Sequence, residues 1–241
     1  MVTAGWVSLA FAFAAVWLYA FLREDLRHPE PVWMVLLAIA GGVGALVAAD
    51  RIEAYLVPDL GILARSMADR AWVAFGVSGP VEEGLKFLAV LLLVWPRTHF
   101  DEPMDGIVYA AAAGVGFALA ENLAFMVGQP EVIVVRGPAA TAVHVLFAAF
   151  WGGALGHARH ESSRAVGIGI VTTGLVLAAL AHGAFNMVTF SVEHGLDANV
   201  GRALQLGLVL LCALFLRWRL RVAHRRRPFR YRGGSDATTK R

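Results

Sequence analysis

Gly79-Pro80-Val81-Glu82-Glu83-Gly84-Leu85-Lys86 places two adjacent carboxylates and a lysine within an otherwise apolar run. An acidic residue near the middle of a bilayer costs about 2.5–3.5 kcal/mol on insertion scales, so a pair there needs a partner or a function. On a helix, Lys86 lies within about one turn of both glutamates and can reach either carboxylate. Pro80 and the glycines beside it interrupt or kink such a helix, and the freed carbonyls must be satisfied inside the protein or by water. We therefore predict a polar site inside a bundle of membrane helices.

The composition is that of an integral membrane protein. The chain of 241 residues is 58% hydrophobic and 16% charged, and its mean hydropathy is +0.63. This leaves too little polar surface for a soluble globule of this size. The single Cys212 cannot form a disulfide within the chain, and we expect it to be a buried thiol. The first apolar run lacks a basic preceding region, so we predict a spanning helix there and not a signal peptide.

We predict an all-α fold, a polytopic transmembrane helical bundle of about seven spanning helices. Without an internal repeat or linker, residues 1–220 are expected to form one bundle. The charged stretch 50–70 has an amphipathic piece too short to cross, and we predict that it lies on the membrane surface. The predicted spans are residues 2–22, 31–49, 71–95, 105–127, 139–156, 165–190 and 202–218.

The basic C-terminal end sets the predicted orientation. Residues 221–241 are rich in arginine and follow an apolar helix, which is typical of a cytoplasmic anchor and not of a nucleic-acid tail. We predict that this tail is disordered and cytoplasmic, and we expect no nucleic-acid partner. The arginines of the other loops are equally divided between the two sides of the membrane, so the tail alone determines the predicted orientation. With an odd number of spans, the N-terminus is then external.

Further polar residues recur in the later spans, and their depths agree. They are Glu121, Asn122, His144, His182 and Asn186. Counting along helices of alternating direction, at about 1.5 Å per residue, places Glu82, Glu121, His144 and His182 within roughly one 10 Å layer near the external face. A single histidine or asparagine in a membrane helix often only holds helices together. Such contacts have no reason to share one level, so we predict a common pocket.

Two chemistries fit two imidazoles and several carboxylates at one level. In the first, His144, His182 and Glu121 hold a zinc ion with an open position for water. Glu82 or Glu83 is then the general base, and poor solvation tunes its basicity. In the second, no metal binds and a glutamate activates water directly. No H-E-x-x-H motif is present, so these residues alone leave both open.

Several residues have supporting roles in these hypotheses. In the metal-free reaction a histidine assists proton transfer and Asn186 donates a hydrogen bond to the developing oxyanion. In the zinc reaction Lys86 adjusts the basicity of the glutamate that acts as the base. Asp105 stands beside a proline at the start of the fourth span, where capping of the helix is expected. The alternative places Asp105 in the cavity, bound to Lys86 or Arg97.

Small residues predict which helices pack closely. Gly152 and Gly156 form a G-x-x-x-G pattern on the fifth span, and Gly114 with Ala118 forms a similar pattern on the fourth. Such patterns let helix backbones approach in membranes. This packing would bring His144 and Glu121 toward each other.

The chain carries a series of motifs in a fixed order: Glu82-Glu83-x-x-Lys86, Phe100-Asp101-Glu102-Pro103-Met104-Asp105-Gly106-Ile107-Val108-Tyr109, Gly116-Phe117-x-x-x-Glu121-Asn122, His144 and His182-x-x-x-Asn186. In this order they resemble the PrsW family of membrane proteases. The resemblance covers about residues 25–186, with a motif core of about 25–190, and includes the acidic, proline-containing loop 27–31. The family is distantly similar to CAAX prenyl endopeptidases, whose pattern also has a double glutamate, an F-x-x-x-H and an H-x-x-x-N helix. Glu121 here occupies the place of that first histidine.

The resemblance implies a multi-pass hydrolase of a bacterial or archaeal cell membrane, often described as a metalloprotease. Its expected substrate is a membrane-tethered protein, such as an anti-sigma factor, cleaved near the external face. Glu82, Glu83, His144 and His182 match the positions expected to be essential, with Glu121 supporting them. Two other functions fit the buried charges: a proton- or ion-coupled transporter or channel, and a scaffold that holds a partner helix.

Overall fold

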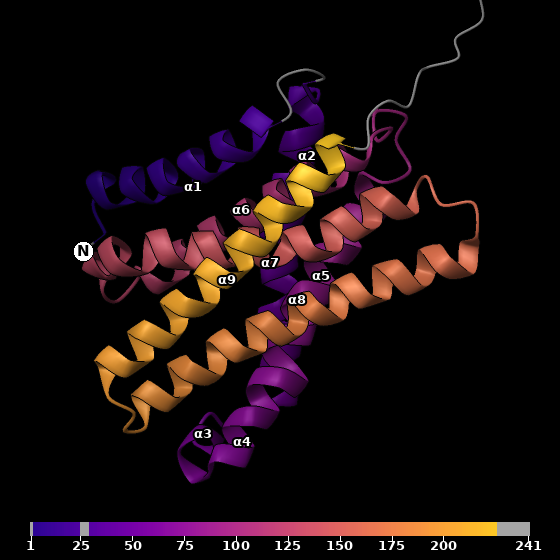
Figure 1. Ribbon diagram of the computed structural model, residues 1–241. Helices are drawn as coiled ribbons and strands as arrows, with labels where there is room; N and C mark the ends of the chain where they lie inside the picture. The colour runs from indigo at the N-terminus through magenta and orange to yellow at the C-terminus, as the bar shows by residue number, and fades with distance from the viewer. Residues whose placement is uncertain (1, 25–28, 226–241) are drawn as a thin grey trace, which may run out of the picture.

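The computed structural model describes residues 2–24 and 29–225, and these residues form helices and connecting turns without a strand (Figure 1). The predicted all-α bundle is confirmed. Its long helices are α1 (Ala4–Glu24), α2 (Val32–Leu56), α5 (Gly79–Leu93), α6 (Pro103–Phe125), α7 (Ile133–Ala158), α8 (Arg164–Glu193) and α9 (Ala198–Arg225). The short elements are α3 (Ile62–Arg65), α4 (Met67–Ala71), the π-helical η1 (Trp72–Ser78) and the 3₁₀ turn η2 (Pro130–Val132).

Most of the predicted spans correspond to one long helix each. Within the described residues, 6 helices are long and apolar enough to cross a membrane, namely α1, α2, α6, α7 together with η2, α8 and α9 up to Arg221. Many of their large apolar side chains face outward, as lipid-facing residues do in a membrane protein.

The remaining predicted span, residues 71–95, is helical but interrupted. α4, η1 and α5 follow one another without a break from Met67 to Leu93, and α5 alone has 15 residues. The backbone N–H of Gly79 donates to Ala74 O, five residues back, which is the π-helical pattern. Pro80, at the start of α5, has no N–H to donate, so the bonding register changes where the charged residues begin.

The second predicted span was too short. α2 runs to Leu56, so Asp50 and Glu53 belong to its last two turns and not to a surface segment. Only the part after Leu56 leaves the long helix, where it forms the short helices α3 and α4. The extension matters because it carries Glu53 toward the polar residues of α5 and α6.

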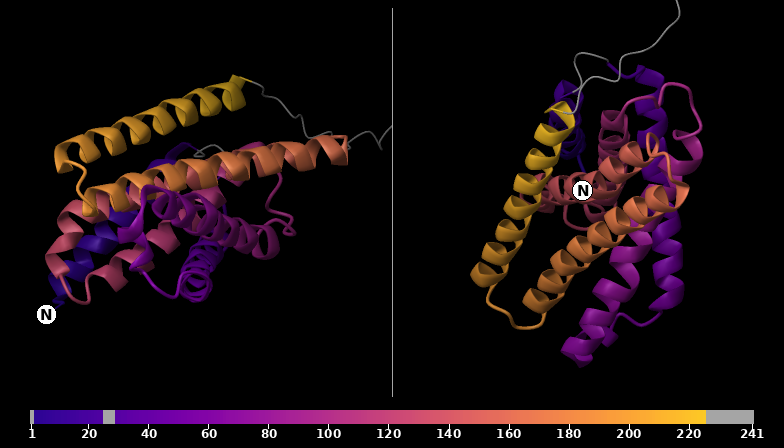
Figure 2. Two further views of the ribbon diagram at one scale, coloured as in Figure 1. Left: turned by 90° about the horizontal axis from the view of Figure 1, so that it is seen from below. Right: turned by 45° about the vertical axis from the view of Figure 1, so that its right-hand side comes forward.

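α6 and α7 pass through the middle of the bundle and are the most buried of the long helices (Figure 1). α1, α2 and α5 pack around α6, whereas α8 and α9 cover another side of the pair. α9 is the outermost helix in the view from below, and it packs mainly on α7 and α8 (Figure 2). The predicted tail, 221–241, lies outside the described residues apart from the last turn of α9, as do residues 27 and 28 of the loop at 27–31.

Small residues set the close approach of α6 and α7, as the sequence predicted. A Cβ atom on Gly114 would lie 2.8 Å from the carbonyl oxygen of His144. Farther along the pair, Gly106 and Gly152 face each other so closely that a side chain on either would overlap the opposite helix. This contact fixes the height of His144 on α7 against α6.

Gly114→Ala should therefore lower the free energy of unfolding by about 1–3 kcal/mol, because the added methyl group overpacks the α6–α7 contact. Thermal unfolding in detergent measures this. Gly169→Ala, on an open face of α8 with nothing within 4 Å of the new Cβ, is the matched control and should change stability by less than about 1 kcal/mol. Equal melting temperatures for both variants would contradict this account of the packing.

Candidate active site

Four helices bring their polar residues to one place. Glu82 and Glu83 lie at the start of α5, His144 in the first half of α7, and His182 in the last part of α8. Their exposed fractions are 7%, 0%, 3% and 2%. Glu121, near the end of α6, contacts His144. The predicted convergence of these segments is thus a feature of the structure.

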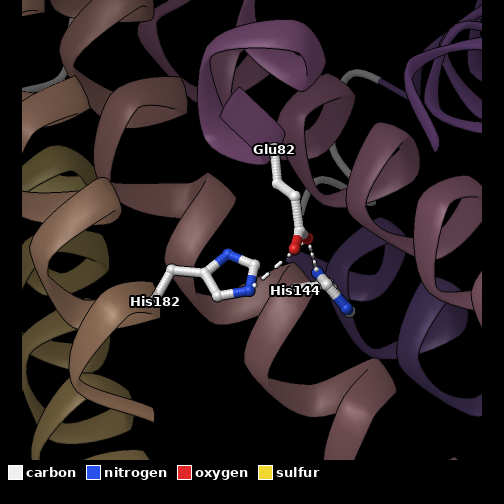
Figure 3. A group of neighbouring side chains, drawn as sticks. All are labelled: Glu82, His144 and His182. Atoms are coloured by element: carbon white, nitrogen blue, oxygen red, sulfur yellow. Dashed lines mark ion pairs between the residues drawn. The ribbon is translucent and has the colours of Figure 1, made fainter. Parts of the chain in front are cut away.

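Glu82 points between the two imidazole rings (Figure 3). Its Oε2 atom lies 3.4 Å from His182 Nε2 and 3.9 Å from His144 Nδ1. This oxygen is buried and has no hydrogen-bond partner among the described residues. A buried carboxylate oxygen without a partner is costly, so the geometry leaves Glu82 ready to bind a proton, a water molecule or a cation.

Glu83, by contrast, is fully bonded. Its Oε1 atom accepts from Lys86 Nζ at 2.5 Å and from His182 Nδ1 at 2.9 Å, while its Oε2 accepts from Trp151 Nε1 at 3.0 Å. Lys86 and Trp151 have exposed fractions of 0% each. Glu83 therefore holds α5, α7 and α8 together and has little capacity left to act as a general base.

Each imidazole is backed by a carboxylate on the nitrogen that points away from Glu82. His182 Nδ1 donates to Glu83, and His144 Nε2 donates to Glu121 at 2.9 Å, because an ionised carboxylate can only accept. Arg136 of α7 pairs with Glu121 at 2.6 Å. This leaves His182 Nε2 and His144 Nδ1 as the acceptor nitrogens that face Glu82, and a carboxylate behind a histidine is typical of metal ligands.

The residues that could hold a metal differ from the predicted set. Ligand atoms of Glu82, His144 and His182 all lie within 4.8 Å of one another, and this is the group that the described residues assemble. Glu121 was predicted as the third ligand, but it bonds the opposite nitrogen of the His144 ring. Two imidazoles and one carboxylate suit zinc, and the unpartnered Glu82 oxygen fits a cation. The donor set therefore fits a metal ion.

Three other predicted residues are placed less centrally. Asn122 is buried and donates to Thr141 Oγ1 at 3.3 Å, so this bond joins α6 to α7 and does not involve the histidines. Asp105 lies at the opposite end of α6, where its side chain caps the helix by accepting from the N–H groups of Asp101 and Glu102. The alternative that placed Asp105 in the cavity is wrong. Asn186 follows His182 by one turn, half-buried, and makes no side-chain hydrogen bond with a described residue.

Three residues near the site were not singled out from the sequence. Trp151 follows His144 by seven residues, which puts both on one face of α7, but an apolar spacing does not reveal its bond to Glu83. The sequence predicts Arg136 in a loop, whereas it lies in the first turn of α7 and pairs with Glu121. Glu53 has a buried oxygen without a hydrogen-bond partner among the described residues and lies close enough for its charge to act on Glu121. The sequence does not point to Glu53, because the predicted helix ends at residue 49 whereas α2 continues to Leu56.

Comparisons with known proteins show which family the chain belongs to. Residues 30–217 match the family described as PrsW family intramembrane metalloprotease. The chain belongs to the PrsW family. Protease PrsW of Bacillus subtilis (strain 168) is 33% identical over 189 residues, which is 78% of this chain and 84% of that protein. Protease PrsW of Geobacillus kaustophilus (strain HTA426) is 31% identical over 154 residues, 64% of this chain and 66% of that protein. No solved structure matches the chain.

Membership in the PrsW family supports a membrane protease and a multi-pass protein of bacterial membranes. The resemblance seen in the motifs is thereby confirmed. All the residues of the polar cluster lie inside the matched region, which extends to residue 217 and so also includes most of α9. The motif core had ended near residue 190.

Trp151→Phe should lower the free energy of unfolding by about 1.5–3 kcal/mol, because it removes a donor from a buried carboxylate while keeping an aromatic ring. In a Glu83→Gln background the same change should cost less, since the acceptor no longer carries a charge. Chemical or thermal unfolding of the four proteins of this cycle measures the coupling. A coupling energy near zero would show that Trp151 contributes only by packing.

Proposed function

We propose that this protein is an intramembrane endopeptidase that hydrolyses a peptide bond of a membrane-tethered protein. The observation that carries the proposal is the unpartnered, buried carboxylate oxygen of Glu82, which faces His182 Nε2 and His144 Nδ1. Family membership supports peptide hydrolysis as the reaction. In this proposal one water molecule binds beside the Glu82 carboxylate.

In this mechanism Glu82 accepts a proton from the attacking water. A carboxylate in a poorly solvated site is a stronger base than one in water, and general-base catalysis contributes about 10²–10⁴-fold. His182 Nε2 accepts a hydrogen bond from this water, and Glu83 and Glu121 fix the orientations of the two rings. Glu82 then returns the proton to the leaving amine.

A metal ion would be held by His144 Nδ1, His182 Nε2 and one Glu82 oxygen, which would leave the second Glu82 oxygen as the base, and the ion would polarise the carbonyl and acidify the water. The donor set favours zinc, which is the cofactor we propose. Glu121 stays behind His144 and maintains the basicity of the ring, as partners of ligating histidines do.

Asn186 is the proposed donor to the oxyanion. It lies one turn from His182 on α8, and its amide is not engaged by any described side chain. A donor held close to the developing negative charge is worth about 10²–10³ in kcat. Because the amide is neutral, it stabilises the tetrahedral intermediate without adding a buried charge.

The position of the cluster supports cleavage near the external face. The site residues come from the start of α5, the end of α6, the first half of α7 and the last part of α8, which share one side if successive helices alternate in direction. With a cytoplasmic C-terminus and an external N-terminus, this is the external side. The proposed substrate is a membrane-anchored protein such as an anti-sigma factor, which would reach the site through the bilayer.

Alanine substitutions at Glu82, Glu83, His144 or His182, made one at a time, should each abolish cleavage, with a loss of at least about 10²-fold. Each removes either the base, a holding group or the partner that orients one. Cleavage of a membrane-tethered reporter in proteoliposomes measures activity, and membrane fractionation checks insertion. Glu193→Ala, on the exposed end of α8, is the control and should remain active. Full activity in two of the four variants would overturn the assignment.

Asn186→Ala should reduce kcat by about 10²–10³-fold while KM and the melting temperature stay close to wild type, because the lost donor acts only on the intermediate. Steady-state kinetics with the same reporter separates the two parameters. Asn199→Ala, exposed at the start of α9, is the matched control. A rise in KM alone would instead assign Asn186 to substrate binding.

The same preparations also test the transporter hypothesis. A transporter or channel with these carboxylates would show pH-coupled flux in liposomes and no cleavage. A peptidase shows cleavage, and sealed vesicles containing it hold a proton gradient as well as empty vesicles do.

A further inference from the structure

The positive charge of Lys86 lies where it would repel a bound metal ion. Its Nζ atom is 3.1 Å from His144 Nδ1, the nitrogen that belongs to the possible metal group, and 2.5 Å from Glu83 Oε1. The ammonium also lies 4.5 Å from the centre of the Phe117 ring. Lys86 and Glu83 both have exposed fractions of 0%. The lysine therefore serves as a cation fixed inside the site.

When no metal is bound, the Lys86 ammonium has a hydrogen-bond acceptor inside the site. An ammonium group has only donors, so Lys86 must donate to the His144 Nδ1 lone pair. That lone pair is the one a metal would need, because the other nitrogen of the ring donates to Glu121. The lone pair can serve the ammonium or the metal, but not both.

We infer that Lys86 is an internal competitor of the metal, occupying His144 Nδ1 in the metal-free protein and releasing it when a metal ion binds. In this exchange the hydrogen bond from Lys86 to His144 breaks and a metal–nitrogen bond forms. Lys86 keeps its proton and its contact with Glu83, which the flexible stem of lysine allows. The inference deepens the proposed function, since it concerns the metal-binding step of the same site.

Electrostatics gives the expected direction. A bound divalent cation and a lysine ammonium within a few ångströms repel each other strongly in a poorly solvated site. Metal affinity should therefore be held below that of an otherwise equal site with two histidines and one glutamate. Glu83 compensates the lysine charge but lies on the far side of His182 from Glu82, through its bond to Nδ1. Removing the positive charge at residue 86 should raise metal affinity.

The test is metal binding to the full chain purified in detergent. Zn²⁺ binding is followed by equilibrium dialysis with elemental analysis, and Co²⁺ binding by visible absorption. We expect Lys86→Met to bind one equivalent of Zn²⁺ about tenfold or more tightly than wild type. Lys86→Arg keeps the positive charge and is the matched control, so it should show no such gain. His144→Ala in the Lys86→Met background should remove the binding.

A second variant keeps the test decisive if Lys86→Met misfolds. Lys86→Met leaves Glu83 without its cation, whereas Lys86→Met with Glu83→Gln replaces the buried ion pair by a neutral pair. The double variant should show the same gain in affinity. Equal Zn²⁺ affinity of wild type and both neutral variants would overturn the inference, and so would the absence of His144-dependent binding in all of them.

Cleavage assays on the same preparations separate this inference from the proposed function. Wild-type cleavage without any gain in metal affinity for the neutral variants would refute the competition and leave the peptidase standing. A gain in affinity with no cleavage by wild type would uphold the competition and refute the peptidase.

Discussion

The structure depends on one buried carboxylate, that of Glu83. Removing an ionised group from water costs several kcal/mol unless its lone pairs are satisfied. Glu83 meets this cost with three donors from different elements: Lys86 one turn along its own helix, Trp151 on α7 and His182 on α8. Because all three bonds must form together, they fix the relative positions of α5, α7 and α8. The interaction that makes the charge tolerable also assembles the site.

The same bonds determine what the histidines can do. Glu83 accepts a hydrogen bond from His182 Nδ1, and Glu121 accepts one from His144 Nε2, so the two rings turn their other nitrogens toward Glu82. The arginine at 136 pairs with Glu121 at 2.6 Å and keeps it an acceptor. Around the rings, Phe117 and Phe147 pack at centroid distances of 4.9 and 5.6 Å and restrict their rotation. The orientation is thus built before any substrate arrives.

Sequence reasoning found the members of the cluster but not their order within it. Charge in an apolar span and a shared depth suffice to predict that Glu82, Glu121, His144 and His182 meet. They do not determine which ring nitrogen faces inward, because that depends on side-chain rotation. Sequence reasoning therefore predicts Glu121 as a ligand, whereas in the structure it bonds the His144 nitrogen that points away from Glu82. The length of α2 was missed for a related reason, since charges at Asp50 and Glu53 look like a helix end until the helix is known to continue past the apolar core.

The π-helical turn before α5 determines which way the polar side chains at the start of α5 point. A turn with bonds to the fifth residue back inserts an extra residue, and one residue rotates the rest of the helix by about 100° at 3.6 residues per turn. Gly79 lets α8 approach here, because a Cβ atom would lie 2.5 Å from Ala179 O. Without the inserted residue, the face that carries Glu82 would turn away from His182. Pro80 has no N–H to donate to the fourth residue back. The sequence therefore disfavours an uninterrupted α-helix, in which Glu82 would face away from His182.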